Sequence, residues 1–135
     1  MKNIVKILHF ENDDINAQLI NSKIQLENMR CEIKNVYKMD DYLRALMTDL
    51  FDLVLCDYSS PDIDWINANS FVREISPHTS FILVSPTQNE IIITDEINKH
   101  LSDYFQNAKL DNISPVINSA ISRIEIHDGV SCNWG

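Results

Sequence analysis

The alternation of short apolar runs with segments of helical periodicity constrains this chain more than any other feature. We expect strands over residues 4–10, 32–37, 52–56, 81–84 and 103–105, and helices over residues 13–29, 40–49, 65–75, 88–99 and 110–127. Strands that alternate with helices are typical of a parallel sheet with both faces covered. The pattern therefore predicts an α/β protein.

We expect a single domain, because 135 residues are enough for one hydrophobic core. The predicted domain covers residues 1–128 and contains a doubly wound, five-stranded parallel sheet with strand order 2-1-3-4-5, in a three-layer α/β/α arrangement. Residues 129–135 are expected to form a flexible tail. In such a sheet the functional crevice lies at the carboxyl ends of the strands.

Charge and glycine content exclude several classes of function. The formal net charge of −9 argues against the basic surface that nucleic acids or anionic membranes require. Both glycines lie after residue 128, so no glycine-rich loop for nucleotide phosphates is available. With no predicted signal peptide and three widely spaced cysteines, we expect a cytoplasmic protein that binds neither nucleic acid nor membrane.

Polar side chains follow the predicted strands where the carboxyl edge of the sheet should lie. Glu11 and Asn12 follow the first strand, Asp57 follows the third and Ser85 follows the fourth. Clustered carboxylates suit Mg²⁺, which prefers oxygen ligands. A cation beside Asp57 would let this carboxylate accept a phosphoryl group, because it offsets the charge on the phosphoryl oxygens.

Four segments give the chain a resemblance to the receiver domains of bacterial two-component response regulators. They are KILHFEND (6–13), DLVLCDYSSPDID (52–64), FILVSPT (81–87) and DYFQN (103–107). The resemblance extends over residues 4–127 and implies a flavodoxin-like fold and a role in a phosphorelay. It also implies a histidine kinase or phosphotransfer protein as the phosphoryl donor, and an effector protein or a further output domain as the target.

The resemblance assigns a role to each of several residues. Asp57 matches the phosphoacceptor; Glu11, Asn12 and Asp57, with the carbonyl of Ser59, match the Mg²⁺ ligands; Ser85 and Tyr104 match the hydroxyl and aromatic switch residues; and Asn107 falls at the position of the switch lysine. The implied activity is no more than acceptance of a phosphoryl group, so we do not expect an enzyme in the usual sense.

Two of these positions lose a charge relative to the family pattern. Asn12 replaces an aspartate, so Mg²⁺ affinity should be weak. Asn107 replaces a lysine and cannot neutralise a phosphoryl group. Lys109 lies two residues further on, and strand geometry leads us to expect that it points elsewhere.

An interface is predicted around Trp65, Tyr104, Ile91 and Ile92. Trp65 stands where the family usually has glycine, and either packs at the start of a helix or anchors a partner. The run Ile91–Ile93 is either core or an apolar output face, because three consecutive isoleucines cannot all point inward from a helix. A homodimer is one of the assemblies that such a face allows.

Three alternatives to a phosphorylated receiver domain remain open. The chain could be a pseudo-receiver that binds partners without phosphorylation. A flavodoxin-like cofactor binder is disfavoured, because the acidic FENDD segment would repel a cofactor phosphate. A hydrolase with Asp57 as nucleophile would need an acid two residues later, where Ser59 stands.

Overall fold

The computed structural model describes residues 4–26, 30–58, 60–85 and 105–122. Its elements are β1 (Val5–Phe10), α1 (Asp14–Leu26), β2 (Cys31–Val36), α2 (Met39–Thr48), β3 (Leu53–Asp57), α3 (Trp65–Ile75), β4 (Ser80–Ser85), β5 (Phe105–Lys109) and a short 3-10 turn (Leu110–Asn112). A last helix continues over residues 113–122. None of the described helices has the length and apolar character needed to span a membrane.

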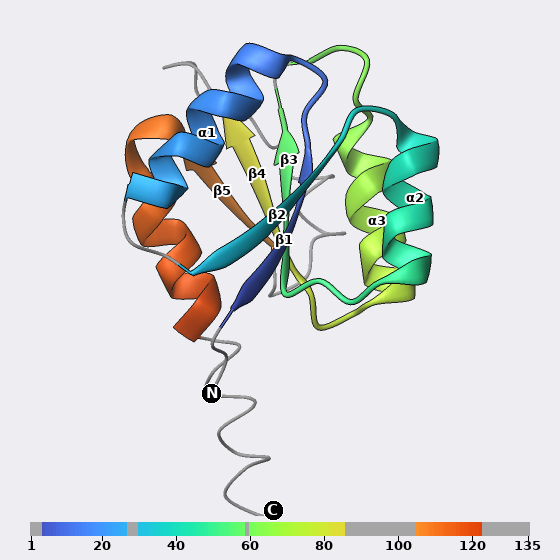
Figure 1. The fold of residues 1–135 in the computed structure, drawn as a ribbon. Helices are drawn as coiled ribbons and strands as arrows, with labels where there is room; N and C mark the ends of the chain where they lie inside the picture. The colour runs from blue at the N-terminus through green and yellow to red at the C-terminus, as the bar shows by residue number, and fades with distance from the viewer. Residues whose placement is uncertain (1–3, 27–29, 59, 86–104, 123–135) are drawn as a thin grey trace, which may run out of the picture.

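The five strands form one parallel sheet with the order β2-β1-β3-β4-β5 (Figure 1). This arrangement confirms the predicted fold class and strand order. Figure 1 shows α1 and the last helix on one face of the sheet, and α2 and α3 on the other. The described residues therefore form the three layers expected from the alternating sequence pattern.

Each face of the sheet contributes to a separate hydrophobic cluster. On the side of α2 and α3, Phe10, Val54 and Leu83 are fully or almost fully buried. On the side of α1 and the last helix, Ile7 and Leu55 are fully buried. Neighbouring residues of one strand divide between the two clusters, as the alternation of side chains along a strand requires.

Short-range hydrogen bonds set the helix starts. Asp13 Oδ1 accepts from the backbone N–H groups of Ile15 (2.9 Å) and Asn16 (3.1 Å), and so caps α1. Asp64 caps α3 in the same way through the N–H of Asn67 (3.1 Å). Because both caps follow loops at the carboxyl edge of the sheet, they also fix the path of the chain around that edge.

The predicted position of the last strand is wrong. Among the described residues the strand is Phe105–Lys109, so it continues four residues beyond the predicted end at residue 105. It forms one border of the sheet, and of its side chains only Ala108 is fully buried, so it lacks the continuous apolar run that marks β3 and β4. The helix predicted over residues 88–99 lies outside the described residues.

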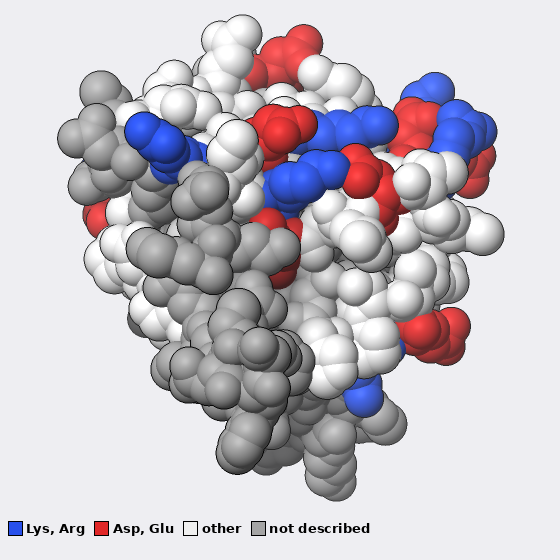
Figure 2. Space-filling model, turned by 60° about the horizontal axis from the view of Figure 1, so that its bottom comes forward, with Lys and Arg blue, Asp and Glu red and all other residues white. Residues whose placement is uncertain are grey.

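Side chains of opposite charge lie close together at the edge of the sheet where the strands begin. Lys6 Nζ lies 2.7 Å from both carboxylate oxygens of Asp49 and 5.5 Å from the centre of the Phe51 ring. The backbone N–H of Lys6 donates to Asp52 Oδ2 at 2.8 Å. Figure 2, which brings this side of the molecule forward, shows basic and acidic side chains interspersed. These contacts tie the segment between α2 and β3 to the first strand.

Candidate functional site

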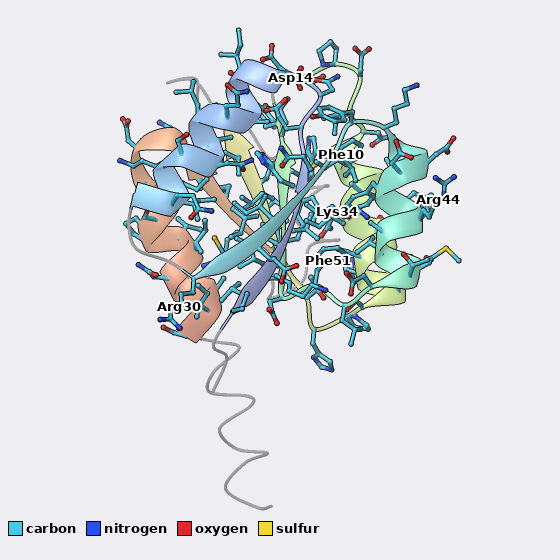
Figure 3. All side chains as sticks on the ribbon, in the orientation of Figure 1. Phe10, Asp14, Arg30, Lys34, Arg44 and Phe51 are labelled. Atoms are coloured by element: carbon cyan, nitrogen blue, oxygen red, sulfur yellow. The ribbon has the colours of Figure 1, made fainter. Side chains whose placement is uncertain are left out.

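Three of the predicted site residues meet at the carboxyl edge of the sheet. Asp57 and Ser85 are the last residues of β3 and β4, and Glu11 directly follows β1. Phe10 pairs with Cys56 in the register of β1 and β3, so Glu11 and Asp57 occupy the next position on adjacent strands. Phe10 and Asp14 mark the β1 end and the α1 start at this edge in Figure 3. All three site side chains are buried.

The carboxyl group of Asp57 lies close enough to Glu11 to affect the charge of the Glu11 side chain. Burial, and then repulsion from Asp57, raise the pKa of Glu11 to about 8. Hydrogen bonding between the two side chains raises the pKa further, whereas the backbone N–H of Asp13, which donates to Glu11 Oε2 at 3.2 Å, lowers it. Without a cation, Glu11 therefore keeps its proton at neutral pH.

Backbone groups hold Asp57 in place. Its Oδ2 atom accepts from the N–H of Ser60 at 2.9 Å. The N–H of Tyr58 donates to the carbonyl of Val84 at 2.9 Å, which continues the pairing of β3 and β4 by one residue. The loop after β3 thus orients the carboxylate through Ser60, a residue that was not predicted to belong to the site.

The residues at this edge fit a hard divalent cation, but with little negative charge. Glu11 Oε1 is buried and has no hydrogen-bond partner among the described residues, which is costly unless a ligand satisfies it. Within the described ranges, no group of three or more Asp, Glu, His or Cys side chains could hold a metal ion. Mg²⁺ would therefore rely on Glu11, Asp57, the neutral amide of half-buried Asn12, backbone oxygen and water.

The register of β5 separates Asn107 from the strand end. Asn107 is exposed, lies in the middle of β5 and pairs with Leu83, whereas Lys109 ends the strand and pairs with Ser85. The lysine is half-buried. Because β5 runs four residues further than the predicted end at residue 105, Asn107 lies within the strand and not beyond it. Sequence reasoning considered Lys109 and expected it to point elsewhere, because the strand was predicted to end at residue 105; the register places Lys109 at the strand end, beside Ser85.

Trp65 begins α3 and packs against the core. Its ring centre lies 5.8 Å from that of Phe105, which in turn stacks on Phe81 at 5.8 Å. These contacts favour the packing interpretation of Trp65, and a role in partner binding stays a prediction. Ser59, Tyr104, Ile91 and Ile92 lie outside the described residues.

Cys56 precedes Asp57 but belongs to the core. It is fully buried, and burial, followed by the charges of Asp57 and Glu11, raises the pKa of its thiol well above the ordinary value. A thiol in these surroundings stays protonated and unreactive. This agrees with the view that the residue is a small apolar group of the strand.

Comparisons with known proteins show that the fold of this chain is similar to that of solved receiver domains. Similar structures include a CheY-like receiver domain protein from Methanospirillum hungatei (15% identity, 93% of this chain and 99% of that chain covered, TM-score 0.71). The Francisella response regulator 1452 receiver domain is also similar (21% identity, 89% of this chain and 98% of that chain covered, TM-score 0.68). A response regulator receiver domain protein from Clostridium thermocellum is similar too (18% identity, 90% of this chain and 98% of that chain covered, TM-score 0.71).

The chain has the receiver-domain fold. Neither a protein-family model nor a curated protein sequence matches it, so the likeness is one of structure. The resemblance seen in the four sequence segments is thereby confirmed at the level of the fold. The roles of individual residues do not follow from it.

Proposed function

We propose that this chain is a receiver domain that accepts a phosphoryl group on Asp57. The observation that carries the proposal is the buried contact between Asp57 and Glu11 at the carboxyl edge of a receiver-type sheet, with Ser85 ending the adjacent strand. Perturbed carboxyl groups that converge at such an edge are typical of functional sites.

In the proposed reaction Asp57 attacks the phosphorus atom of a phosphohistidine in a histidine kinase or phosphotransfer protein. A bond forms between an Asp57 oxygen and phosphorus, the bond between phosphorus and the histidine nitrogen breaks, and that nitrogen recovers a proton. Mg²⁺ bound by Glu11, Asn12, Asp57 and the carbonyl of Ser59 would neutralise charge on the phosphoryl oxygens. The Ser60 N–H orients the attacking carboxylate.

Two residues would then hold the phosphoryl group. Ser85 can donate its hydroxyl to a phosphoryl oxygen. We propose that Lys109, which ends β5 opposite Ser85, supplies the cation that the resemblance assigned to the position of Asn107. The phosphorylated edge would signal through an effector protein or a further domain, with Tyr104, Ile91 and Ile92 as predicted members of the output surface.

A pseudo-receiver that works without phosphorylation is the second candidate. Its support comes from the weak charge of the site: Asn12 is neutral, and the pKa of about 8 leaves Glu11 protonated at neutral pH without a cation. Such a site attracts Mg²⁺ less strongly than a pair of ionised carboxylates. In this case the described surfaces would bind a partner in a single conformation.

Mass spectrometry of the intact protein separates the two candidates. The protein is incubated with acetyl phosphate and Mg²⁺, with Asp57→Asn as the matched control. Addition of one phosphoryl group to the wild type and none to Asp57→Asn is the result expected for a receiver. An unmodified wild type after prolonged incubation at saturating Mg²⁺ would favour the pseudo-receiver.

A further inference from the structure

The strand β2 presents an edge that no other described strand covers. β2 is the last strand of the sheet on its side, and its only partner among the described residues is β1. The N–H of Val5 donates to the carbonyl of Arg30 (2.9 Å) and the N–H of Glu11 donates to that of Val36 (3.1 Å). In a parallel pair every second residue bonds to the neighbour, so Cys31, Ile33 and Asn35 direct their backbone groups away from β1.

The helices on either side leave this edge accessible. In Figure 1, β2 crosses between α1 and α2, and none of the described helices lies in front of it. Glu32 and Lys34 are exposed, whereas Cys31, Ile33 and Asn35 are half-buried. An accessible row of backbone donors and acceptors is a template for another strand.

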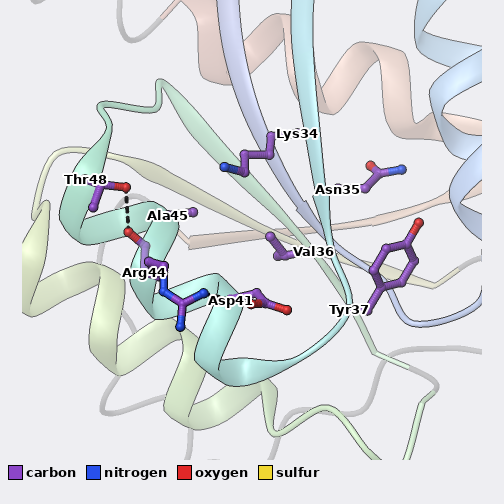
Figure 4. A pocket seen from close by; sticks show the side chains of 8 residues that line it. All are labelled: Lys34, Asn35, Val36, Tyr37, Asp41, Arg44, Ala45 and Thr48. Carbon is purple, nitrogen blue, oxygen red and sulfur yellow. Dashed lines mark hydrogen bonds and ion pairs between the residues drawn. The ribbon is translucent and has the colours of Figure 1, made fainter.

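A groove of about 270 Å³ runs along the same strand. Figure 4 shows Lys34, Asp41 and Arg44 on the side of β2 that faces α2, and Asn35 and Tyr37 on the opposite side. Figure 3 labels Lys34 near β2 and Arg44 on α2 within the described part of the molecule. The groove therefore has room for side chains of an added strand, and its α2 side has two cations next to one acid.

The charges along β2 are arranged symmetrically about Ile33. The strand reads Cys-Glu-Ile-Lys-Asn over residues 31–35. If a second copy paired antiparallel with Ile33 opposite the partner's Ile33, Glu32 would face the partner's Lys34. Lys34 would face the partner's Glu32, and the backbone groups of Ile33 point in the direction that such a pair needs.

We propose that β2 is a homodimer interface, in which two copies join edge to edge into one continuous sheet through the strand centred on Ile33. Opposite charges placed directly across two strands stabilise the pairing. Each Glu32 would also lie close to the cationic side of the partner's groove, formed by Lys34 and Arg44. This inference does not depend on chemistry at Asp57.

Other symmetric registers pair like charges or shorten the contact. A register centred on Glu32 places Glu32 against the partner's Glu32 and Lys34 against the partner's Arg30. A register centred on Lys34 places Lys34 against the partner's Lys34. Centring on Cys31 leaves both Glu32 and Lys34 outside the overlap with β2, and centring on Asn35 leaves Glu32 outside it. The sequence of the strand thus selects one register, which makes the proposal open to a charge-exchange test.

The test is sedimentation velocity of the full chain over a concentration series at low salt. We expect the wild type to form a reversible dimer whose population grows up to roughly 1 mM, the range of a weak interface. Glu32→Lys and Lys34→Glu each place like charges opposite each other at both ends of the contact. Each single variant should therefore dimerise about tenfold more weakly.

An equimolar mixture of these two variants gives the sharpest result. In the mixed pair every lysine faces a glutamate, so the mixture should recover the affinity of the wild type, and so should the double variant Glu32→Lys/Lys34→Glu. Glu74→Lys, an exposed change of the same type on α3, is the control and should dimerise as the wild type does. A wild type that stays monomeric at roughly 1 mM, single variants that dimerise normally, or a mixture that fails to recover would each overturn the proposal.

Discussion

Charged side chains are arranged differently at the two edges of the sheet: opposite charges pair at the amino edge, whereas two carboxyl groups meet at the carboxyl edge. At the amino edge, Lys6 and Asp49 form an ion pair with side chains that are 34% and 46% exposed. At the carboxyl edge, Glu11 and Asp57 bring two carboxyl groups together in a buried position, and burial, followed by repulsion from Asp57, raises the pKa of Glu11. The first arrangement satisfies its charges at low cost in water. The second keeps Glu11 protonated beside Asp57, and a carboxyl group with a perturbed pKa is the pattern expected of a site that binds a cation or a phosphoryl group.

The largest effect should come from the cation that we assign to the carboxyl edge. Lys109→Ala should weaken binding of beryllofluoride, a phosphoryl mimic, about tenfold to a hundredfold, because a charge-assisted hydrogen bond contributes about 1.5–3 kcal/mol. Asn107→Ala, two residues away in the same strand, is the matched control and should leave binding unchanged. Isothermal titration calorimetry with Mg²⁺ present measures both. If Asn107→Ala lost more beryllofluoride affinity than Lys109→Ala, Asn107 and not Lys109 would be the residue that contacts the phosphoryl mimic.

Asn12 gives a smaller effect at the same edge. Asn12→Asp adds a negative charge beside Glu11, so Mg²⁺ should bind about tenfold more tightly, equivalent to about 1.4 kcal/mol. Titration of Mg²⁺ followed by amide NMR compares the variant with the wild type. The exposed change Gln18→Glu on α1 serves as a control for nonspecific charge. Equal affinities of wild type and Asn12→Asp would show that Asn12 is not a ligand.

The pH dependence of the free energy of unfolding should reveal the raised pKa of Glu11 beside Asp57. A carboxyl group whose pKa is raised from 4.5 to about 8 by folding contributes stability that is complete below pH 4.5 and is lost as pH rises through about 8. His9 acts in the opposite sense below pH 6.5, because burial lowers its pKa to about 4 and the folded protein must exclude its proton. The two contributions oppose each other between pH 4.5 and 6.5, and above pH 6.5 the loss from Glu11 remains.

Urea unfolding from pH 6.5 to 8 measures this effect. Without Mg²⁺, the free energy of unfolding should fall with a slope of up to about 1.4 kcal/mol per pH unit, the limit for one proton. Glu11→Gln should remove this fall, and saturating Mg²⁺ should reduce it, since the cation favours the ionised carboxylate. An unchanged slope in Glu11→Gln would mean that Glu11 is ionised in the folded protein.

The smallest effect should come from the amino edge. Asp49→Asn removes the partner of Lys6 in an exposed pair, so unfolding should become only slightly easier, and added salt should abolish the difference. Urea unfolding at low and high salt checks this. As a contrast, Tyr42→Phe removes the buried hydrogen bond from Tyr42 Oη to the Ala68 carbonyl (2.7 Å) and should cost about 1–3 kcal/mol at either salt concentration. A salt-independent loss in Asp49→Asn would give the amino edge a larger structural role.

The sequence predicted one half of the site better than the other, for a physical reason. Glu11, Asp57 and Ser85 stand at the ends of interior strands, whose buried residues form apolar runs that are easy to recognise. Lys109 ends a border strand with a mixed pattern, so neither its bounds nor its register could be predicted from periodicity. The elevated pKa of Glu11 also required the structure, because it depends on burial and on a neighbour 46 residues away in sequence.

Amide NMR with beryllofluoride and Mg²⁺ tests the central claim most directly, namely that the carboxyl edge around Asp57 is a phosphoryl-accepting site. The account predicts large chemical-shift changes at Glu11, Asp57, Ser85 and Lys109, little change at Lys6 and Asp49, and no response in Asp57→Asn. A wild-type spectrum that does not change at saturating beryllofluoride and Mg²⁺, or that changes equally in Asp57→Asn, would contradict it.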